Sequence, residues 1–436
     1  MVPIKTVLKN SEQVTRLFSH LEFDGNKLNH QPGSVLGSTA LIAGTTIGAG
    51  ILALPAVTLP SGIVPSTSGL IGVWLYALVT GLLVAEVTLN TIRTEGHPNI
   101  GFLGVVEKIL GKLGARIAGG AYLFMHYALL VAYITEGGEI LGATAAKVWG
   151  MQILPTWVGT MTFTLLFGGI MYLGREKFIE KLNSAFVGIV IVSFLGLLFL
   201  GGRHIQSAQL LFQNWNALGS AISVMSVALF FQNVVPLVVT QLEGDARKIR
   251  QSIFIGSIIP LIMFLAWNAV ILGSVSADML HGTSTVFDPL QILRAGGAGQ
   301  WLGVLVSIFS EFAIVTSFIG FVYGLLDLFK DIFLPAKWQQ LSSRLPLYSL
   351  VLFPPMTLGT LNPSIFFTAL DYTGTFSISV LGGIIPALMS WKQRQEQENS
   401  DSTNQPLVPG GKVTLIAIVG VALAMMGRQI LSIYTK

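Results

Sequence analysis

Hydrophobic residues in this chain form long unbroken runs that are separated by short polar stretches. A membrane-spanning helix needs about 20 mostly apolar residues to cross about 30 Å of hydrocarbon, and about eleven runs reach that length. Strands of a membrane barrel would alternate apolar and polar residues, which these runs do not. The pattern predicts an all-α polytopic membrane protein with about eleven transmembrane helices. The expected spans are 34–57, 67–92, 115–145, 156–173, 182–200, 215–241, 250–275, 300–326, 347–361, 373–391 and 412–434.

Polar stretches at both ends divide the chain into parts. Residues 1–33 are polar and mixed in charge, which indicates a cytoplasmic tail and not a secretory signal. Residues 392–411 are poor in apolar residues and are expected to form a flexible cytoplasmic linker. The linker sets residues 412–436, which hold the eleventh helix, apart from a ten-helix core at 34–391.

Composition supports a lipid environment. Charged residues make up 11% of the chain, hydrophobic residues 52%, and the mean hydropathy is +0.71, so there is too little polar surface for a protein in water. The net charge of +4 does not indicate a nucleic-acid partner, because the basic residues are scattered between apolar runs. The absence of Cys excludes disulfides, thiolate metal sites and cysteine nucleophiles.

The basic residues also predict an orientation, because Lys and Arg concentrate on the cytoplasmic side of membrane proteins. With the N-terminus in the cytoplasm and eleven spans, the C-terminus lies outside. This arrangement leaves five of the 25 Lys and Arg on the outer side: Lys147, Arg203, Arg294, Arg428 and Lys436.

Two spans carry residues that interrupt a helix. The first contains GTTIGAGILALP from Gly44 to Pro55, and the sixth contains FFQNVVP from Phe230 to Pro236. The breaks occupy corresponding positions of two five-span halves, 34–200 and 215–391, which is the pattern of inverted-repeat secondary transporters. The sequence therefore predicts a 5+5 inverted repeat with discontinuous helices one and six, followed by one extra helix.

Broken backbone at membrane depth is tolerated where it lines a cavity or is buried in protein. The carboxylate of an amino acid is expected at the N–H groups of Gly48, Ala49 and Gly50, and its ammonium at carbonyls near Thr45, Thr46 and Phe230. Backbone dipoles would then bind the zwitterion without charged side chains, which are costly in a bilayer. The alternative is that these glycines only allow helices to pack closely, and that the amides of Gln232 and Asn233 only bond a neighbouring helix.

Several segments resemble the hydroxy/aromatic amino acid permease family, a branch of the amino acid transporters with the leucine-transporter fold. The resemblance rests on the motifs ALIAGTTIGAGILALPAVTLPSGIVPS (40–66), AEVTLN (85–90), AYITEGGEIL (132–141), QNVVP (232–236) and VTSFIGFVYGLLDLF (315–329). It implies import of tyrosine, tryptophan or phenylalanine across a bacterial inner membrane, usually together with protons. Enterobacterial members commonly carry a His-containing motif at the break in span six, where this chain has Gln232 and Asn233.

Aromatic residues near the breaks are candidates to contact an aromatic substrate. Tyr133 is the strongest, with Phe230, Phe231, Phe312 and Tyr127 beside it, because aromatic pairs add about 0.5–1.5 kcal/mol beyond area burial. The alternative for each is packing against other helices or lipid.

Acids inside spans are candidates to carry a coupled proton, because burial raises the pKa of a carboxyl group and acids at membrane depth are costly. They are Glu136, Glu139, Glu86 and Glu311. The alternative is a polar contact between helices or, for Glu86, a side chain that reaches toward the cytoplasmic surface. His126 is a further relay candidate that more commonly would be a packed polar residue.

Sodium is the alternative coupling ion. Thr316 and Ser317 form a hydroxyl pair in span eight, at the position where sodium-coupled relatives of this fold place ligands, and carbonyls near Ala43 and Thr46 could complete an oxygen site. Such hydroxyl pairs also bond back to their own helix. Some proton-coupled relatives place a lysine in the middle of span five, which this chain lacks.

Other functional classes find little support. The chain has no G-x-S-x-G, H-E-x-x-H or G-x-G-D segment of an enzyme, and no repeated filter segment of a channel. We expect no cofactor beyond the ion gradient, an amino acid as the partner, and no nucleic acid. A membrane sensor or scaffold without transport activity stays as the alternative from another class.

Overall fold

The polar N-terminal tail contains a short antiparallel hairpin. In a computed structural model, β1 (Leu21–Asp24) pairs with β2 (Lys27–His30), with Leu21 opposite His30. The tail also contacts the protein body, since Leu17 N–H donates to the Glu243 carbonyl at 2.8 Å. The structure describes residues 17, 21–24, 27–30, 33–48, 50–95, 101–150, 155–205, 211–274, 300–333, 344–362, 365–398 and 406–434.

Helices fill the predicted spans. Within the described residues, nine helical stretches are long and apolar enough to cross a membrane, and the bent pair α1 (Val35–Thr46) and α2 (Gly50–Thr58) makes a tenth. The other helices are α3 (Ile63–Glu95), α4 (Phe102–Trp149), α5 (Thr156–Leu173), α6 (Glu176–Gly201), α8 (Leu218–Ala228), α9 (Val235–Gln241), α10 (Ala246–Ser274), α12 (Gln300–Phe333), α13 (Arg344–Leu361), α14 (Phe366–Tyr372), α15 (Ile385–Glu398) and α16 (Gly411–Tyr434).

The expected eleven spans are therefore reduced to nine or ten. The segment expected at 347–361 is helical, as α13, but it does not qualify as a span. Its 18 residues include Arg344 at the start and Pro354 and Pro355 in the middle, which lower its mean hydropathy. The predicted repeat of two five-helix halves stays a prediction.

Two boundaries differ from the sequence prediction. Helix α15 continues to Glu398, into the expected linker, because Gln, Arg and Glu are strong helix formers. Helix α4 is longer than a membrane span, and Gly111 divides it with φ 73° and ψ −174°, a backbone conformation that favours glycine. The helical turns before Gly111 are thus set off from the membrane-spanning part of α4.

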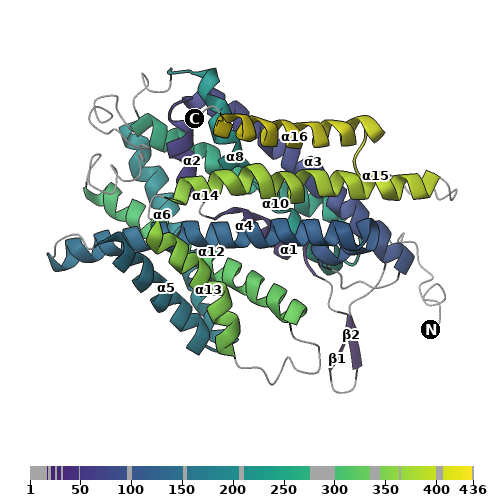
Figure 1. Cartoon of the computed structure of the whole chain (residues 1–436), viewed down its shortest axis with the longest axis horizontal. Coiled ribbons are helices and arrows are strands. Elements are labelled where there is room, and N and C mark those ends of the chain that lie inside the picture. The colour runs from purple at the N-terminus through teal and green to yellow at the C-terminus, as the bar shows by residue number, and fades with distance from the viewer. Residues whose placement is uncertain are drawn as a thin grey trace.

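Long helices lie side by side around α4. Helix α4 packs against α5, α12, α13 and α14, while α10 packs against α1 and α3, and α12 also packs against α6. Figure 1 shows α4, α15 and α16 running along the long axis of the molecule. Two short π-helical stretches, η7 (Thr373–Ile378) and η8 (Val380–Ile384), join α14 to α15.

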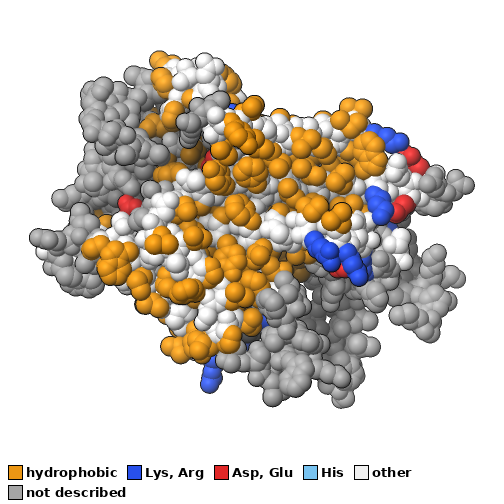
Figure 2. Space-filling view, in the orientation of Figure 1, with side chains coloured by type: hydrophobic (Ala, Val, Ile, Leu, Met, Phe, Trp, Pro, Cys, Tyr) orange, Lys and Arg blue, Asp and Glu red, His pale blue; other side chains and the backbone are white. Residues whose placement is uncertain are grey.

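The surface matches a protein that sits in lipid. Figure 2 shows hydrophobic side chains over the middle of the visible face and most of the visible Lys and Arg side chains at its right-hand end. Helix α6 alone exposes Val192, Leu195 and Phe199 by more than half of their surface. A main hydrophobic core holds the bundle together, and a second small cluster joins α3, α15 and α16.

Candidate functional site

The first expected span is interrupted where its glycines predicted. Helix α1 ends at Thr46, α2 begins at Gly50, and their axes differ by 51°. The last carbonyls of α1 and the first N–H groups of α2 lie at the break, where helix ends lack intrahelical partners. Ile51 N–H bonds the Gly48 carbonyl at 3.1 Å, and Ala49 lies outside the described residues.

Three predicted site residues from three elements meet at this break. A β-carbon added at Gly48 would lie 3.0 Å from Ser317 Oγ of α12 and 3.9 Å from the Tyr133 hydroxyl of α4. The Tyr133 hydroxyl is hydrogen-bonded with Ser317, and its ring is buried with an edge contact to Phe321 at 5.5 Å between ring centroids. The break therefore presents glycine backbone to two hydroxyl groups.

The two interrupted spans touch through their backbones. A β-carbon added at Gly50 would lie 2.7 Å from the Cα of Ala228, the last residue of α8. Glycine is needed here because any side chain would enter the backbone of the other broken helix. The start of α2 is also fixed by α10, because the Trp267 indole N–H donates to the Ile51 carbonyl at 2.9 Å.

The second break is the irregular segment between α8 and α9. Leu229 to Phe231 leave the helical path, and a 3₁₀ turn, η4 (Gln232–Val234), leads into α9. The side chain of Gln232 supplies hydrogen bonds at this break. Its Oε1 accepts from the Phe231 N–H at 3.0 Å, and its Nε2 donates to Thr80 Oγ1 of α3 at 2.8 Å. The Gln232 amide thus fixes the break to α3 and is not open to a ligand.

The other residues of the second break are two buried aromatic rings and one amide. The Phe231 ring is buried against Gly81 of α3, while the Phe230 ring lies against Gly382 of the π-helical segment. Asn233 is the exception, because its buried Oδ1 has no hydrogen-bond partner within the described part of the chain. A buried amide oxygen without a partner calls for an explanation, and a ligand's ammonium is one.

Phe312 lies on another face of α12 from Ser317. It stacks on Phe186 of α6 with ring centroids 5.0 Å apart. The five-residue step from 312 to 317 turns about 140° around the helix, beyond one full turn. The structure therefore joins Ser317 to the first break and places Phe312 against α6.

The predicted acids fall into two groups. Glu136 is buried on α4, one helical turn from Tyr133, while Glu139 on α4 and Glu311 on α12 are half-buried. Both carboxylate oxygens of Glu311 are buried. These three acids lie on the helices that supply Tyr133 and Ser317.

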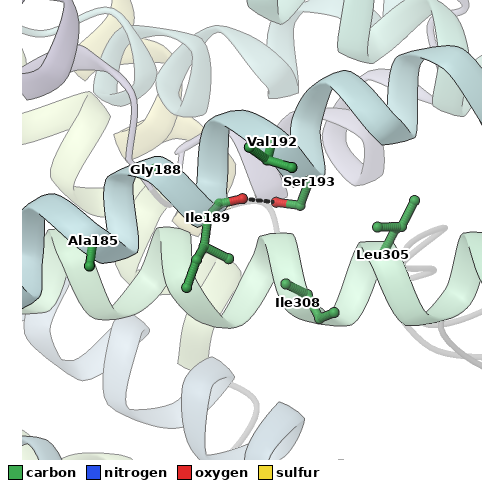
Figure 3. Close-up of a pocket in the computed structure, with 7 residues that line it drawn as sticks. All are labelled: Ala185, Gly188, Ile189, Val192, Ser193, Leu305 and Ile308. Atoms are coloured by element: carbon green, nitrogen blue, oxygen red, sulfur yellow. Dashed lines mark hydrogen bonds between the residues drawn. The ribbon is translucent and has the colours of Figure 1, made fainter.

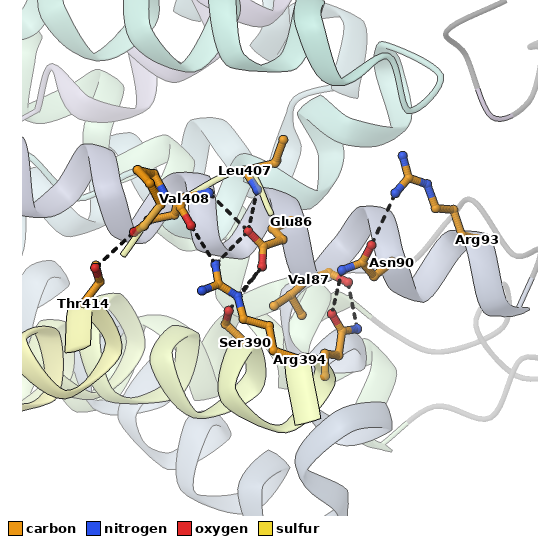
Figure 4. A network of polar contacts seen from close by, with 11 residues as sticks. Glu86, Val87, Asn90, Arg93, Ser390, Arg394, Leu407, Val408 and Thr414 are labelled. Carbon is orange, nitrogen blue, oxygen red and sulfur yellow. Dashed lines mark hydrogen bonds and ion pairs between the residues drawn. The ribbon is translucent and has the colours of Figure 1, made fainter. Parts of the chain in front are cut away.

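The carboxylate of Glu86 is bonded within the protein to a side chain and to the backbone. Arg394 donates from Nε to Oε1 at 2.8 Å and from Nη2 to Oε2 at 3.0 Å, and Leu407 N–H donates to Oε2 at 2.7 Å. Figure 4 shows Arg394 and Leu407 converging on this carboxylate. Protonation would remove acceptor capacity from these bonds, so Glu86 is placed to hold helices together.

The predicted hydroxyls mostly bond their own helices. Thr316 and Ser317 both donate to the Ala313 carbonyl, at 3.0 and 2.9 Å, and Thr45 and Thr46 donate to carbonyls four residues earlier. A hydroxyl that donates still has lone pairs, so Ser317 keeps acceptor capacity toward the break. Thr45 and Thr46 therefore offer no free hydroxyl protons at the end of α1.

His126 packs between α4 and α12. Its ring lies 3.9 Å from the Tyr122 ring and 4.8 Å from the Phe321 ring, measured between centroids. A β-carbon added at Gly324 would lie 2.7 Å from His126 Nε2, so glycine makes room for the imidazole. These contacts match a packed polar residue.

A groove of about 470 Å³ lies away from both breaks, between α6 and α12. Figure 3 shows its apolar lining and the Ser193 hydroxyl, which bonds the Ile189 carbonyl at 2.7 Å. Val192 is largely exposed beside it. The groove opens on the apolar outer surface and offers no charged group to a zwitterion, so it is not the candidate site.

Sequence reasoning missed the residues that support the first break from α10. Besides Trp267, the neighbouring Asn268 accepts from Thr58 Oγ1 at 2.7 Å and donates to Ser66 Oγ at 3.0 Å. It thereby joins the end of α2 to the start of α3. A polar Trp-Asn pair inside a long apolar run was the signal that could have indicated them.

A bundle of apolar helices, two of them interrupted at points that touch each other, is typical of membrane transport proteins. The chain belongs to the tryptophan/tyrosine permease family, whose model matches residues 31–428. The predicted resemblance to aromatic amino acid permeases is confirmed. The chain is a transporter and not an enzyme.

Tyrosine- and tryptophan-specific transport proteins are similar to this chain along most of its length. Tyrosine-specific transport system 2 of Haemophilus influenzae is 28% identical over 395 residues, covering 89% of this chain and 94% of the relative. A tryptophan-specific transport protein of the same organism is 29% identical over 381 residues, covering 83% of this chain and 88% of the relative. Tyrosine-specific transport system 1 of that organism is 28% identical over 399 residues, covering 88% and 93%.

Proposed function

We propose that this chain imports aromatic amino acids, with tyrosine favoured over tryptophan and phenylalanine, by alternating access and together with protons. The observation that carries the proposal is the meeting of Gly48, Tyr133 and Ser317 at the break in the first span. Names of the relatives support the substrate class, since they state tyrosine or tryptophan. The proposed location is the bacterial inner membrane, with the N-terminus in the cytoplasm.

In this proposal, helix ends bind the charged groups of the substrate. The carboxylate occupies the N-terminal end of α2, where N–H groups and the helix dipole favour an anion. The ammonium faces carbonyls at the end of α1 and the Oδ1 of Asn233, which has no partner within the described residues. The Tyr133 hydroxyl is placed to recognise a polar group of the bound substrate.

The side chain of the substrate needs an apolar, aromatic surrounding. Phe230 is the predicted pocket residue that lies at the second break, with its ring against Gly382. Phe231 and Phe312 are engaged elsewhere, with Gly81 and Phe186 respectively. The proposed pocket thus narrows from the predicted set to Tyr133 and Phe230.

Proton coupling is assigned to the acids of α4 and α12. Glu136, Glu139 and Glu311 are buried or half-buried on the two helices that meet the first break. Ionisable groups inside membrane spans commonly take part in proton transfer, so a carboxyl group in such a place can hold a proton in one state and release it in the other. Glu86 is left out of this group because Arg394 and the backbone hold its carboxylate.

Sodium is the second candidate, favoured by the hydroxyl of Ser317 beside Gly48. Together with Thr316 and carbonyls near the end of α1 it would form a site of neutral oxygens, which suits a hard cation. This alternative predicts uptake that depends on sodium and is insensitive to a proton gradient.

Purified protein in liposomes distinguishes these candidates. Labelled tyrosine should accumulate against its gradient when the outside is made acidic, without sodium, and Glu136→Gln, Glu139→Gln or Glu311→Gln should remove this response to pH in at least one case. Accumulation that requires sodium and ignores pH would assign the coupling to sodium. Failure to accumulate any aromatic amino acid under either gradient would contradict the proposed function.

A further inference from the structure

The carboxylate of Glu86 anchors a segment far away in sequence. We call residues 406–410, which precede α16, the strap. Leu407 N–H and Val408 N–H donate to Glu86 Oε2 at 2.7 and 3.3 Å. Arg394, which is bonded to both oxygens of Glu86, also donates from Nη2 to the Val408 carbonyl at 3.1 Å.

The ion pair therefore bonds the strap from both sides of its backbone: the anion accepts its N–H groups and the cation donates to its carbonyl. Figure 4 shows Glu86, Arg394, Leu407 and Val408 in this arrangement. Only the carboxylate form accepts all of these bonds, and only a guanidinium offers its donors in a fixed fork. The pair has geometry that a neutral or lysine-containing pair could not reproduce.

Further bonds tie α15 to α3 beside the pair. Gln393 Nε2 donates to the Val87 carbonyl at 3.1 Å and to Thr91 Oγ1 at 3.0 Å, and Asn90 Nδ2 donates to Gln393 Oε1 at 3.3 Å. Lys392 Nζ donates to the Ile109 carbonyl of α4 at 2.7 Å. The end of α15 is thus fixed to two neighbouring helices.

Helix α16 is attached elsewhere by side-chain bonds: Gln429 Nε2 donates to Asp371 Oδ2 at 2.6 Å, and the Tyr76 hydroxyl donates to the Ile418 carbonyl at 3.4 Å. Of the residues in the most apolar stretch of α16, 11% are buried, compared with 56% in that of α3. A small cluster seats it, in which Val408 of the strap packs with Leu83, Ala387, Leu415 and Ile418. Holding Val408 in place therefore holds the start of α16 in place.

Helix α3 also contacts the second break. Thr80 and Gly81 of α3 hold Gln232 and Phe231, and Glu86 lies six residues further along, about 9 Å at the rise of an α-helix. Any displacement of α3 at Glu86 is transmitted through a continuous helix to these contacts. The strap and the break in span six thus share one rigid support.

The geometry points to a permanent anchor: the Glu86–Arg394 pair, by clamping the strap, joins α3, α15 and α16 into one unit that stays closed through the transport cycle. The statement that the unit stays closed through the transport cycle rests on the proposed function, whereas the clamping of the strap does not.

A single cysteine tests the clamp, and the chain offers a background without native cysteines. Val408→Cys places a thiol at a buried position of the strap. In purified protein, N-ethylmaleimide should label it slowly, and adding Glu86→Gln should raise the labelling rate by about tenfold or more, because labelling follows the open population. Arg394→Lys, which keeps the charge and loses the fork, should give a smaller rise.

The matched control is the exposed pair of Lys412 and Glu398, 3.8 Å apart and close to the strap in sequence. Glu398→Gln removes the same charge without touching the clamp, so the labelling of Val408→Cys should change by less than about twofold, as exposed pairs hold little. Equal labelling in Glu86→Gln and Glu398→Gln would overturn the anchor.

A second measurement leaves Glu86 and Arg394 unchanged. Val408→Cys protein in liposomes is exposed to maleimide with and without tyrosine and an inward proton gradient. Equal protection in both conditions is expected for a permanent anchor. Faster labelling during uptake would overturn its permanence and identify the strap as a moving part. If the protein takes up no tyrosine at all while Glu86→Gln still speeds the labelling of Val408→Cys, the transport proposal is contradicted and the clamp is supported.

Discussion

The two interrupted spans differ in the groups that face their broken backbone. At the first break, between Thr46 and Gly50, glycine backbone faces hydroxyls that come from other helices, Tyr133 and Ser317. At the second, Gln232 folds its own amide back onto the Phe231 N–H and bonds α3 as well. The first break faces side chains of α4 and α12, and the second is bonded largely by its own side chain and by α3.

This difference separates binding from support. Helix ends can bind a ligand only where they stay unbonded, which is why the proposed substrate site lies at the first break. The second break must keep its shape beside it, because Ala228 contacts Gly50. Asn233 is the one polar side chain of the second break with an oxygen left over in the described residues.

Gly50→Val should have the largest effect, because it attacks the contact between the two breaks. Its β-carbon would fall 2.7 Å from the Ala228 Cα, and a backbone atom cannot move aside as a side chain can. We expect little or no monodisperse protein by size-exclusion chromatography. Gly44→Ala is the control, since open space surrounds Gly44, and wild-type yield is expected. Normal yield of Gly50→Val would refute the close approach.

Gly48→Leu should stop transport with little loss of folded protein. Its neighbours are the ends of two side chains, Ser317 Oγ and the Tyr133 hydroxyl, which can shift to admit a larger residue. The added side chain fills the proposed carboxylate site, so tyrosine uptake should fall by about 100-fold or more, on the order of 3 kcal/mol. Uptake into liposomes, normalised to protein content, measures this. Wild-type uptake would place the carboxylate elsewhere.

Gln232→Leu should weaken the protein more than it weakens recognition. It leaves the Phe231 N–H and the Thr80 hydroxyl without their partner, and each buried unsatisfied group costs about 1–3 kcal/mol. A lower melting temperature and an unchanged KM in the surviving protein are expected.

Asn233→Leu serves as the contrast within the same break. Its Oδ1 has no partner in the described residues, so its removal should not lower the melting temperature and should reduce tyrosine uptake. The opposite pattern, with Gln232→Leu raising KM alone and Asn233→Leu alone lowering stability, would exchange the roles of the two amides.

The sequence predicts the helices and the places where two of them break, because length, apolar content and Gly or Pro are local properties. Gly44 to Pro55 and Phe230 to Pro236 both contain the observed interruptions. Tyr133, Gly48 and Ser317 were also named from the sequence. Their meeting depends on how three helices pack, which no local pattern states.

The same limit explains the residues that were assigned differently. Gln232 and Asn233 are adjacent amides with identical prospects in the sequence, yet one is bonded to α3 and the other is not. Glu86 was a coupling candidate until the structure paired it with Arg394, 308 residues away. Which polar residue is satisfied is a tertiary property, so burial cost alone could not separate these groups.

Tyr133→Phe should have the smallest effect and the most specific one. It keeps the ring that packs against Phe321 and removes the hydroxyl beside Gly48 and Ser317. Because one hydrogen bond is worth about 0.5–1.5 kcal/mol, KM for tyrosine should rise about three- to tenfold, and loss of the bond to Ser317 should lower the melting temperature no more than the control variant does. Tyr348→Phe is the matched control, since its buried hydroxyl bonds the Met171 carbonyl at 3.0 Å between α13 and α5. A rise in KM shared by both variants would mean that the loss of any buried hydroxyl disturbs uptake, whereas a rise confined to Tyr133→Phe would connect the first break to the substrate.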